Sequence, residues 1–180
     1  MDITENLQQA DQMDEIYREA EALEKLDHRN IIRLKKAFVQ FQKKTMIMVM
    51  DFCGGGELYE FVKKRGRLDE YTAREVFKQI VSAISYVHNK GIVHRDLKLE
   101  NVLFMEEGGL TIKVVDFGIS GKNTTNVHES TTAGSIAYMP PEVVSHEDCS
   151  ADPGIDVWAL GCILYSILLG RLPFYGDDEE

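Results

Sequence analysis

The spacing of apolar residues in the first part of the chain predicts a helix. In residues 11 to 27, apolar side chains recur every three or four positions, as they do on one face of a helix. Glu19 lies inside this apolar stripe, either as an exposed carboxylate at its edge or as one aimed inward at a cationic partner. The stripe consists of Ile16, Ala20, Leu23 and Leu26.

Two short β-prone runs follow this helix. IIRLKKAFVQ and TMIMVMDF are separated by the polar QKK, and this arrangement predicts two neighbouring antiparallel strands. The segment CGGGEL comes next. It lacks the spaced glycines and the Lys-Ser/Thr of a phosphate-binding loop, so a flexible hinge is the favoured interpretation over a phosphate nest.

The second half of the chain mixes a clear helix with short strands. Residues 69 to 89 are strongly amphipathic, with Asp69 as a natural N-cap and Gly91 as a natural stop. The runs IV, VLF and TIKVV then predict short strands joined by turns, and residues 119 to 139 predict a long mobile loop. GIDVWALGCILYSILL is apolar almost all round, which predicts a buried central helix.

Composition and charge narrow the class of protein. A chain of 180 residues can bury one core, and its net charge of −10 argues against nucleic acid as the main partner. Three cysteines without a close-set pair indicate neither a disulfide framework nor a zinc site. No apolar stretch is long enough to cross a bilayer and the opening residues do not form a signal peptide, so we expect a cytoplasmic or otherwise intracellular protein without a membrane partner.

Four polar residues near the ends of β-like runs suggest phosphoryl transfer. A single Asp at such a place is more often a turn or capping residue, but Lys98 and Asn101 accompany Asp96, and Asp116 follows the next run. Phosphoryl transfer needs a carboxylate for the attacking hydroxyl, oxygen ligands for magnesium and a cation near the phosphate. Asp96, then Asn101 with Asp116, and Lys98 can fill these three roles.

Four ordered motifs resemble those of the eukaryotic serine/threonine protein kinase family: HRDLKLEN, DFG at 116 to 118, PPE at 140 to 142 and DVWALG at 156 to 161. The resemblance runs from about residue 11 to the end. It implies an α+β, bilobal fold with ATP and Mg²⁺ as cofactors. Residues 11 to 50 would form a partial small lobe with helix C and two strands, 51 to 56 the hinge, and 57 to 180 the large lobe up to its central buried helix.

The resemblance also implies roles in the reaction and in adenine binding. Asp96 matches the catalytic base, Lys98 the phosphate-contacting lysine, and Asn101 and Asp116 the magnesium ligands. Met50 matches the gatekeeper. The remaining matches are Asp51 to Cys53 at the adenine-contacting hinge, Glu57 at the ribose or a basic substrate residue, and Leu103 beneath adenine.

Regulatory positions follow from the same resemblance. Glu19 matches the helix C glutamate that pairs with a strand lysine, and Thr131 matches the activating phosphosite of an upstream kinase. Arg95 could pair with a phosphate there. The matches to the hydrophobic spine and its anchor are Leu23, His94, Phe117 and Asp156.

Substrate preference is predicted from a few positions. Lys98 and GSIAYMPPE are similar to serine/threonine-specific members, so Ser or Thr is the expected acceptor in protein substrates. Glu57 and Glu100 match acids that bind basic substrate residues, which predicts a basophilic enzyme. Within the family, GGGELYEFV and the TTAGS stretch are most similar to the calcium/calmodulin-dependent and AMP-activated kinase group.

The chain departs from the family pattern before Glu19. No residues match the glycine-rich turn or the strand lysine, and we expect the first three strands and the last helices to be missing from this sequence. Three interpretations therefore stay open. The chain is the central piece of an active kinase, a catalytically inactive binding and regulatory module, or an unstable product without activity.

Overall fold

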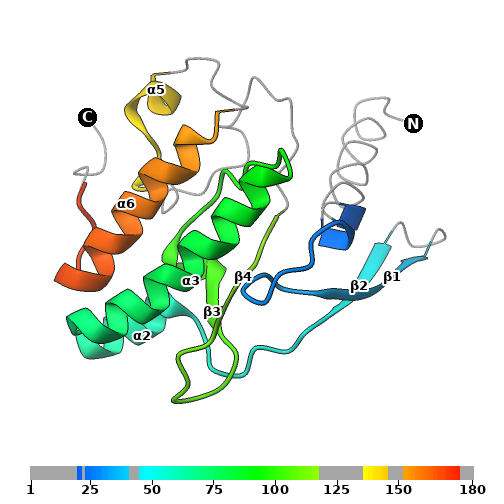
Figure 1. Ribbon diagram of the computed structural model, residues 1–180, viewed down its shortest axis with the longest axis horizontal. Coiled ribbons are helices and arrows are strands. Elements are labelled where there is room, and N and C mark those ends of the chain that lie inside the picture. The colour runs from blue at the N-terminus through cyan, green and yellow to red at the C-terminus, as the bar shows by residue number, and fades with distance from the viewer. Residues whose placement is uncertain (1–19, 22, 41–44, 118–135, 146–151, 175–180) are drawn as a thin grey trace, which may run out of the picture.

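The computed structural model describes residues 20, 21, 23–40, 45–117, 136–145 and 152–174, which form an α+β fold as predicted (Figure 1). The short N-terminal segment and a two-stranded sheet lie on one side, and the helices lie on the other. In chain order the elements are β1 (Leu34–Gln40), β2 (Thr45–Met50), α2 (Leu58–Arg65), α3 (Glu70–Asn89), the 3-10 turn η2 (Leu99–Asn101), β3 (Val102–Phe104), β4 (Ile112–Val114), α5 (Pro141–Val144) and α6 (Gly154–Leu169).

The strands form two antiparallel pairs, which confirms the pairing predicted for the first two. β1 pairs with β2, and β3 pairs with β4. The segment before β1 joins the two sheets, because the amide of Ile32 donates to the carbonyl of Val114 and the amide of Val114 donates to the carbonyl of Asn30. The sheet of β1 and β2, called the small sheet below, is therefore attached directly to β4.

The predicted N-terminal helix is described only in part. Residues 20, 21, 23 and 24 are helical, and Ala20, Leu23 and Leu26 of the predicted stripe are buried. Ile16 lies outside the described residues. The three buried positions agree with the predicted stripe.

Helix α3 confirms the prediction for residues 69 to 89. The Asp69 carboxylate accepts a hydrogen bond from the Thr72 amide at 3.0 Å, and Gly91 takes a positive φ of 73° after the last turn. A Cβ is unfavourable at that φ, so glycine suits the stop. The buried face consists of Thr72, Ala73, Val76, Ile80, Ala83, Ile84 and Val87.

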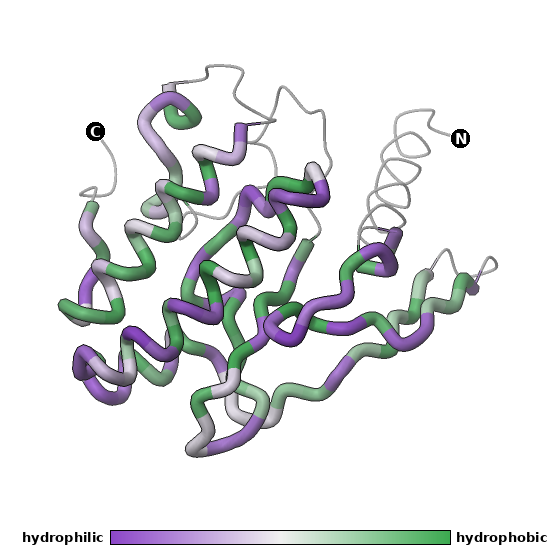
Figure 2. Tube along the Cα trace, viewed as in Figure 1, coloured by the Kyte–Doolittle hydropathy of each residue, from purple (hydrophilic) through white to green (hydrophobic). Residues whose placement is uncertain are grey.

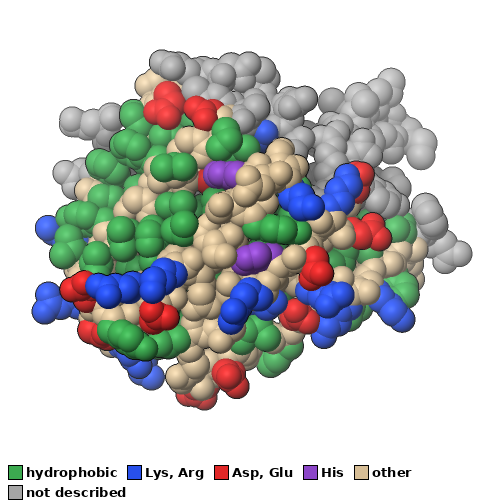
Figure 3. All heavy atoms as spheres, in the orientation of Figure 1, with side chains coloured by type: hydrophobic (Ala, Val, Ile, Leu, Met, Phe, Trp, Pro, Cys, Tyr) green, Lys and Arg blue, Asp and Glu red, His purple; other side chains and the backbone are tan. Residues whose placement is uncertain are grey.

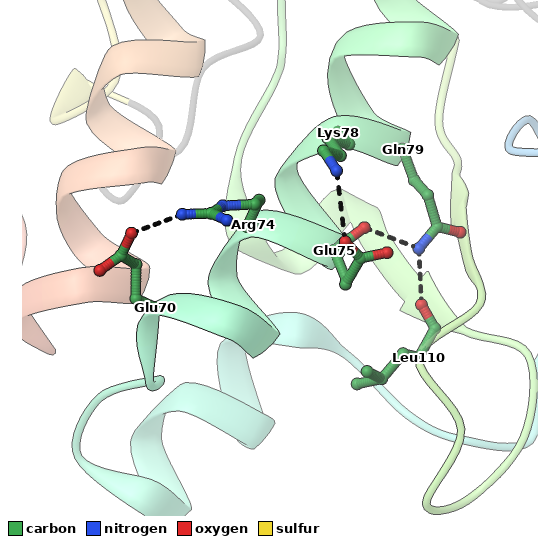
Figure 4. A network of polar contacts seen from close by, with 6 residues as sticks. All are labelled: Glu70, Arg74, Glu75, Lys78, Gln79 and Leu110. Carbon is green, nitrogen blue, oxygen red and sulfur yellow. Dashed lines mark hydrogen bonds and ion pairs between the residues drawn. The ribbon is translucent and has the colours of Figure 1, made fainter.

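Side-chain amides connect α3 to β4 and to the segment before β1. Gln79 donates to the carbonyl of Leu110 at 2.7 Å (Figure 4), and it accepts from the amide of Ile112 at 3.2 Å. Asn30, which is buried, donates to the Gln79 side chain at 2.7 Å. One glutamine thus connects α3, the turn before β4 and the segment before β1.

Helix α6 differs from its prediction, because it is not buried all round. Ile163 and Ile167 are fully buried toward the core, whereas Val157 is 61% exposed and Leu169 is 50% exposed. Figure 2 shows hydrophobic residues along most of α6, and Figure 3 shows apolar side chains gathered on the surface over it. An apolar helix sequence predicts that the helix will be covered by other parts of a protein. The described residues cover only one face of α6.

No helix in the described ranges is both long and apolar enough to cross a bilayer.

The glycines before α2 pack against β3 and the residues that follow it, and this close packing explains why position 55 is a glycine. The amide of Gly54 donates to the carbonyl of Met105 and that of Gly55 to the carbonyl of Phe104, each at 3.0 Å. A Cβ added to Gly55 would lie 2.5 Å from the carbonyl oxygen of Glu106. The segment was predicted to be a flexible hinge, yet its backbone is hydrogen-bonded to the strand beneath it.

Gly55→Ala is expected to destabilise the fold by about 1 to 3 kcal/mol, because the clash with backbone cannot be relieved by a rotamer change. Gly54→Ala is the matched control, since its added Cβ meets only the side chain of Phe52, which is 86% exposed and can move. Urea unfolding followed by circular dichroism measures both variants. Equal midpoints for the two would contradict the packing argument.

Candidate active site

The loop from His94 to Asn101 is held by a buried carboxylate on α6. Both oxygens of Asp156 accept from this loop at 2.8 Å: Oδ2 from the amide of His94 and Oδ1 from the amide of Arg95. Residues 92 and 93 were predicted to be a short strand, and this prediction is wrong. The amides that follow them bind the Asp156 carboxylate in place of a neighbouring strand.

Asp156 is fully buried, and a second contact keeps it charged. The Nε2 of His88, on α3, lies 2.7 Å from Asp156 Oδ2. Burial alone would raise the pKa of Asp156, but the hydrogen bonds from His88 and from the two loop amides hold that pKa below its ordinary value. The loop is therefore anchored to an ionised group.

His94 connects the loop to the segment that carries Asp116. Its Nε2 donates to the carbonyl of Val115 at 3.0 Å, so its Nδ1 is the acceptor for the amide of Asp96 at 3.3 Å. The ring is fully buried and lies 4.8 Å from that of Phe117, which is also buried. Leu23 belongs to the same buried cluster.

Asp96, Lys98 and Asn101 are brought together at the centre of the loop. Lys98 Nζ lies 2.6 Å from Asp96 Oδ2, and the Asn101 amide nitrogen donates to the same oxygen at 3.1 Å and to the carbonyl of Asp96 at 2.7 Å. Both donors bind Oδ2, and Oδ1 takes part in neither of these two contacts. The positive φ of 70° at Arg95 produces the turn that presents this carboxylate.

Asn101 and Asp116 fit the expected magnesium ligands. The amide of Val115, next to Asp116, donates to the carbonyl of Asn101 at 3.0 Å, so the two residues lie on adjacent segments. Since the Asn101 nitrogen faces Asp96, its amide oxygen faces the other way. Asp116 is exposed at a φ of 64°. An amide oxygen and a carboxylate are hard ligands of the kind Mg²⁺ prefers.

The residues expected to contact adenine lie where β2 leads into α2. Asp51 follows β2 directly, and Cys53 Sγ lies 3.7 Å from Met105 Sδ. Leu103 is half-buried on β3 and forms an isolated bridge with Glu57, the exposed N-cap of α2. Met50, at the end of β2, is 38% exposed.

In this segment the pKa of Asp51 is lowered, whereas the pKa of Cys53 is raised. Burial would raise the pKa of Asp51, but Lys35 and Lys113 hold it below its ordinary value. Burial raises the pKa of the Cys53 thiol, so this cysteine stays protonated at neutral pH.

Two predicted site residues lie outside the described residues, and two residues that contact the site were not predicted from the sequence. Glu19 and Thr131 fall in ranges that the structure does not describe. Sequence reasoning missed His88, although it follows the buried Val87 at the end of α3, and Lys113, which is the one charge within the apolar run TIKVV. A lone charge at a strand position was the signal for Lys113.

Comparisons with known proteins identify the family of the chain. The family model described as "Protein kinase domain" matches residues 2–180. Serine/threonine-protein kinase RAD53 of Saccharomyces cerevisiae is 37% identical over 93% of this chain, and human NUAK family SNF1-like kinase 1 is 39% identical over 92%. Serine/threonine-protein kinase 33 of Bos taurus is 40% identical over 91%.

Solved structures show the same fold. The crystal structure of Rad53 1-466 in complex with AMP-PNP matches with a TM-score of 0.75 at 37% identity, covering 92% of this chain and 40% of that one. The structure of the Rad53 kinase domain and SCD2 gives the same TM-score and identity, with 57% of its chain covered. The chain spans 22%, 24% and 35% of the three curated relatives, so it corresponds to a part of each.

Proposed function

The chain belongs to the serine/threonine protein kinase family, and we propose that, as a member most similar to the calcium/calmodulin-dependent and AMP-activated kinase group, it transfers the γ-phosphoryl group of ATP to Ser or Thr of proteins. The observation that carries this proposal is the Asp96, Lys98 and Asn101 cluster beside the segment of Asp116. Catalytic groups on a loop fixed by a buried anchor are positioned before substrate arrives.

In this mechanism Asp96 accepts the proton of the attacking hydroxyl. The hydroxyl oxygen forms a bond to the γ-phosphorus while the bond to the bridging oxygen breaks, and ADP leaves with that electron pair. Lys98 places a positive charge beside the carboxylate and the phosphate, and Asn101 orients Asp96 through two hydrogen bonds. Asn101 and Asp116 would hold Mg²⁺, which would neutralise the phosphate charge when bound.

The reaction is tested with peptides that differ only in the acceptor. With ATP and Mg²⁺, Ser and Thr peptides should gain phosphate and the Tyr peptide should not. Incorporation confined to Tyr would overturn the acceptor assignment. Absence of transfer to all three, with retained peptide binding, would favour the inactive binding and regulatory module instead.

A basic substrate preference is the finer part of this proposal, and a cavity supports it. The cavity has a volume of about 400 Å³, and its lining includes Tyr59, Glu100 and Tyr138 together with two basic residues, Lys63 and Arg171. The Oε2 of Glu100 is buried and accepts no hydrogen bond from the residues that the structure describes. Burial, helped by the Glu100 charge, raises the pKa of Tyr138. A buried carboxylate oxygen in a cavity that two phenol rings also line suits a cationic side chain, which would bind there beside Lys63 and Arg171.

Glu100→Gln is expected to reduce the preference for basic over neutral peptides about tenfold, because one buried charge pair with the substrate is lost. The measurement is the ratio of kcat/KM for the two peptides. Glu70→Gln is the control, since Glu70 is exposed on α3 and its Oε1 lies 2.6 Å from Arg74 Nη2, away from this cavity. An unchanged ratio in Glu100→Gln would show that Glu100 does not bind a basic substrate residue.

Control by an upstream kinase at Thr131 is also part of the proposal. Its support is the sequence match together with the position of Arg95 directly before Asp96. Phosphate at Thr131 would attract a guanidinium that is fixed to the catalytic loop by its own amide. An intracellular location, where ATP and protein substrates meet, belongs to the same proposal.

A further inference from the structure

A buried lysine links the two sheets close to the proposed nucleotide site. Lys113 is the middle residue of β4, and its side chain is only 11% exposed. Its Nζ donates to the carbonyl of Ile31 at 3.0 Å and lies 3.6 Å from Asp51 Oδ2. Lysine is rarely buried without partners, and here both partners come from other segments.

These two partners lie at the same end of the β1–β2 sheet, where the chain enters β1 and leaves β2. Ile31 precedes β1 and forms a parallel bridge with Val114, whereas Asp51 follows β2 and begins the predicted hinge. The amide of Asp51 donates to the carbonyl of Arg33 at 3.2 Å, which closes the base of the sheet. One side chain from β4 therefore contacts both places where the chain enters and leaves this sheet.

The same strand leads to the proposed magnesium ligand. Asp116 follows Val114, the last residue of β4, by two positions. A shift of the hinge relative to β4 would thus change the distance between the segment expected to contact adenine and the segment that carries Asp116. A cation fixed between β4 and the hinge resists such a shift, and its burial reduces screening by solvent.

We propose that Lys113 is a positioning residue that sets the place of the hinge relative to Asp116. What the hinge binds rests on the proposed kinase function, whereas the contact itself can be measured without nucleotide. Lys35 offers a matched comparison. Its Nζ lies 3.1 Å from Asp51 Oδ1, but its side chain is 55% exposed and it belongs to β1, so it does not connect the small sheet to β4.

Hydrogen exchange measured by mass spectrometry tests the contact in the whole chain. In Lys113→Met, residues 31–33 and 51–56 should exchange about tenfold faster, because a hydrogen bond and a charge pair are lost. Residues 80–88 of α3 should exchange as before. Lys35→Met should change the hinge by less than about twofold, as expected for an exposed ion pair.

Two results would overturn the proposal. One is equal exchange of the hinge in Lys113→Met and Lys35→Met. The other is an equal acceleration of all segments, which would mean that Lys113 supports only global stability. Asp51→Asn is the second variant, for use if Lys113→Met does not fold. It leaves Lys113 in place, and hydrogen exchange of residues 51–56 should still be faster than in the parent.

The functional consequence has a separate readout. Titration with AMP-PNP and Mg²⁺ should give a dissociation constant about tenfold higher in Lys113→Met than in the parent, since the site is misplaced. Lys113→Arg should restore part of the affinity by keeping the cation. Unchanged affinity in Lys113→Met would contradict the positioning role. No binding by the parent would instead refute the proposed function, while the exchange data would still decide the contact.

Discussion

Replacing Asp96 with Asn is expected to lower kcat for Ser peptides by about 10²- to 10⁴-fold, the range typical of a lost general base. The amide keeps the shape of the carboxylate, but it cannot take a proton from the attacking hydroxyl. Because Asp96 Oδ2 already accepts from Lys98 and Asn101, an amide nitrogen placed there would also oppose two donors.

The measurement is steady-state phosphorylation at saturating ATP, with circular dichroism to show that the variant is folded. Glu107→Gln is the control, because Glu107 is exposed in the turn between β3 and β4. The control should retain full activity. Comparable rates for Asp96→Asn and the parent would mean that Asp96 does not act on the hydroxyl.

Asp156→Ala is expected to cost about 3 to 5 kcal/mol of folding free energy, the cost of removing one partner from a buried charged network. The amides of His94 and Arg95 and the Nε2 of His88 would all lose their acceptor, a carboxylate that is itself fully buried. Such a loss is a large fraction of the roughly 5 to 15 kcal/mol that stabilises a domain.

Thermal unfolding of Asp156→Ala and Asp152→Ala measures this effect. Asp152 is the control: it is exposed before α6, where its Oδ1 accepts from the amide of Gly154 at 2.8 Å. Losing one such exposed hydrogen bond costs only about 1 kcal/mol. A similar melting temperature for the two variants would contradict the role of Asp156 as the anchor of the loop.

The same carboxylate predicts how stability depends on pH. The pKa of Asp156 is lower in the folded state than in the unfolded chain. Its contribution is therefore complete above the unfolded value of about 3.9, and it is lost as the pH falls through the lower folded-state pKa. Acid unfolding of Asp156→Asn should lack this part of the transition, and an identical acid profile would contradict it.

Local sequence signals predicted the elements that depend on neighbouring residues. Helix α3 was predicted with its cap because Asp69 and the apolar repeat act within a few residues of each other. The pairing of β1 with β2 was predicted for the same reason. The family motifs led to Asp96, Lys98, Asn101 and Asp116 as candidates, and the structure places the first three in direct contact.

Features that depend on distant segments were not predictable in this way. The exposed face of α6 depends on which elements cover it, and the helix sequence carries no information about them. Residues 92 and 93 have the composition of a strand, but the amides after them bind Asp156, which is over 60 residues away in the chain. Lys113 acquires its role only when Ile31 and Asp51 arrive beside it.

The central claim is that the Asp96 loop and Asp116 form a site for a magnesium-bound nucleotide. Calorimetric titration of the protein with AMP-PNP, with Mg²⁺ or with a chelator, tests it most directly. Binding should require Mg²⁺, and it should weaken at least about tenfold in Asp116→Asn, because one hard ligand has lost its charge. Binding that is equal with and without Mg²⁺, or no binding at all, would contradict the claim and favour a role without catalysis.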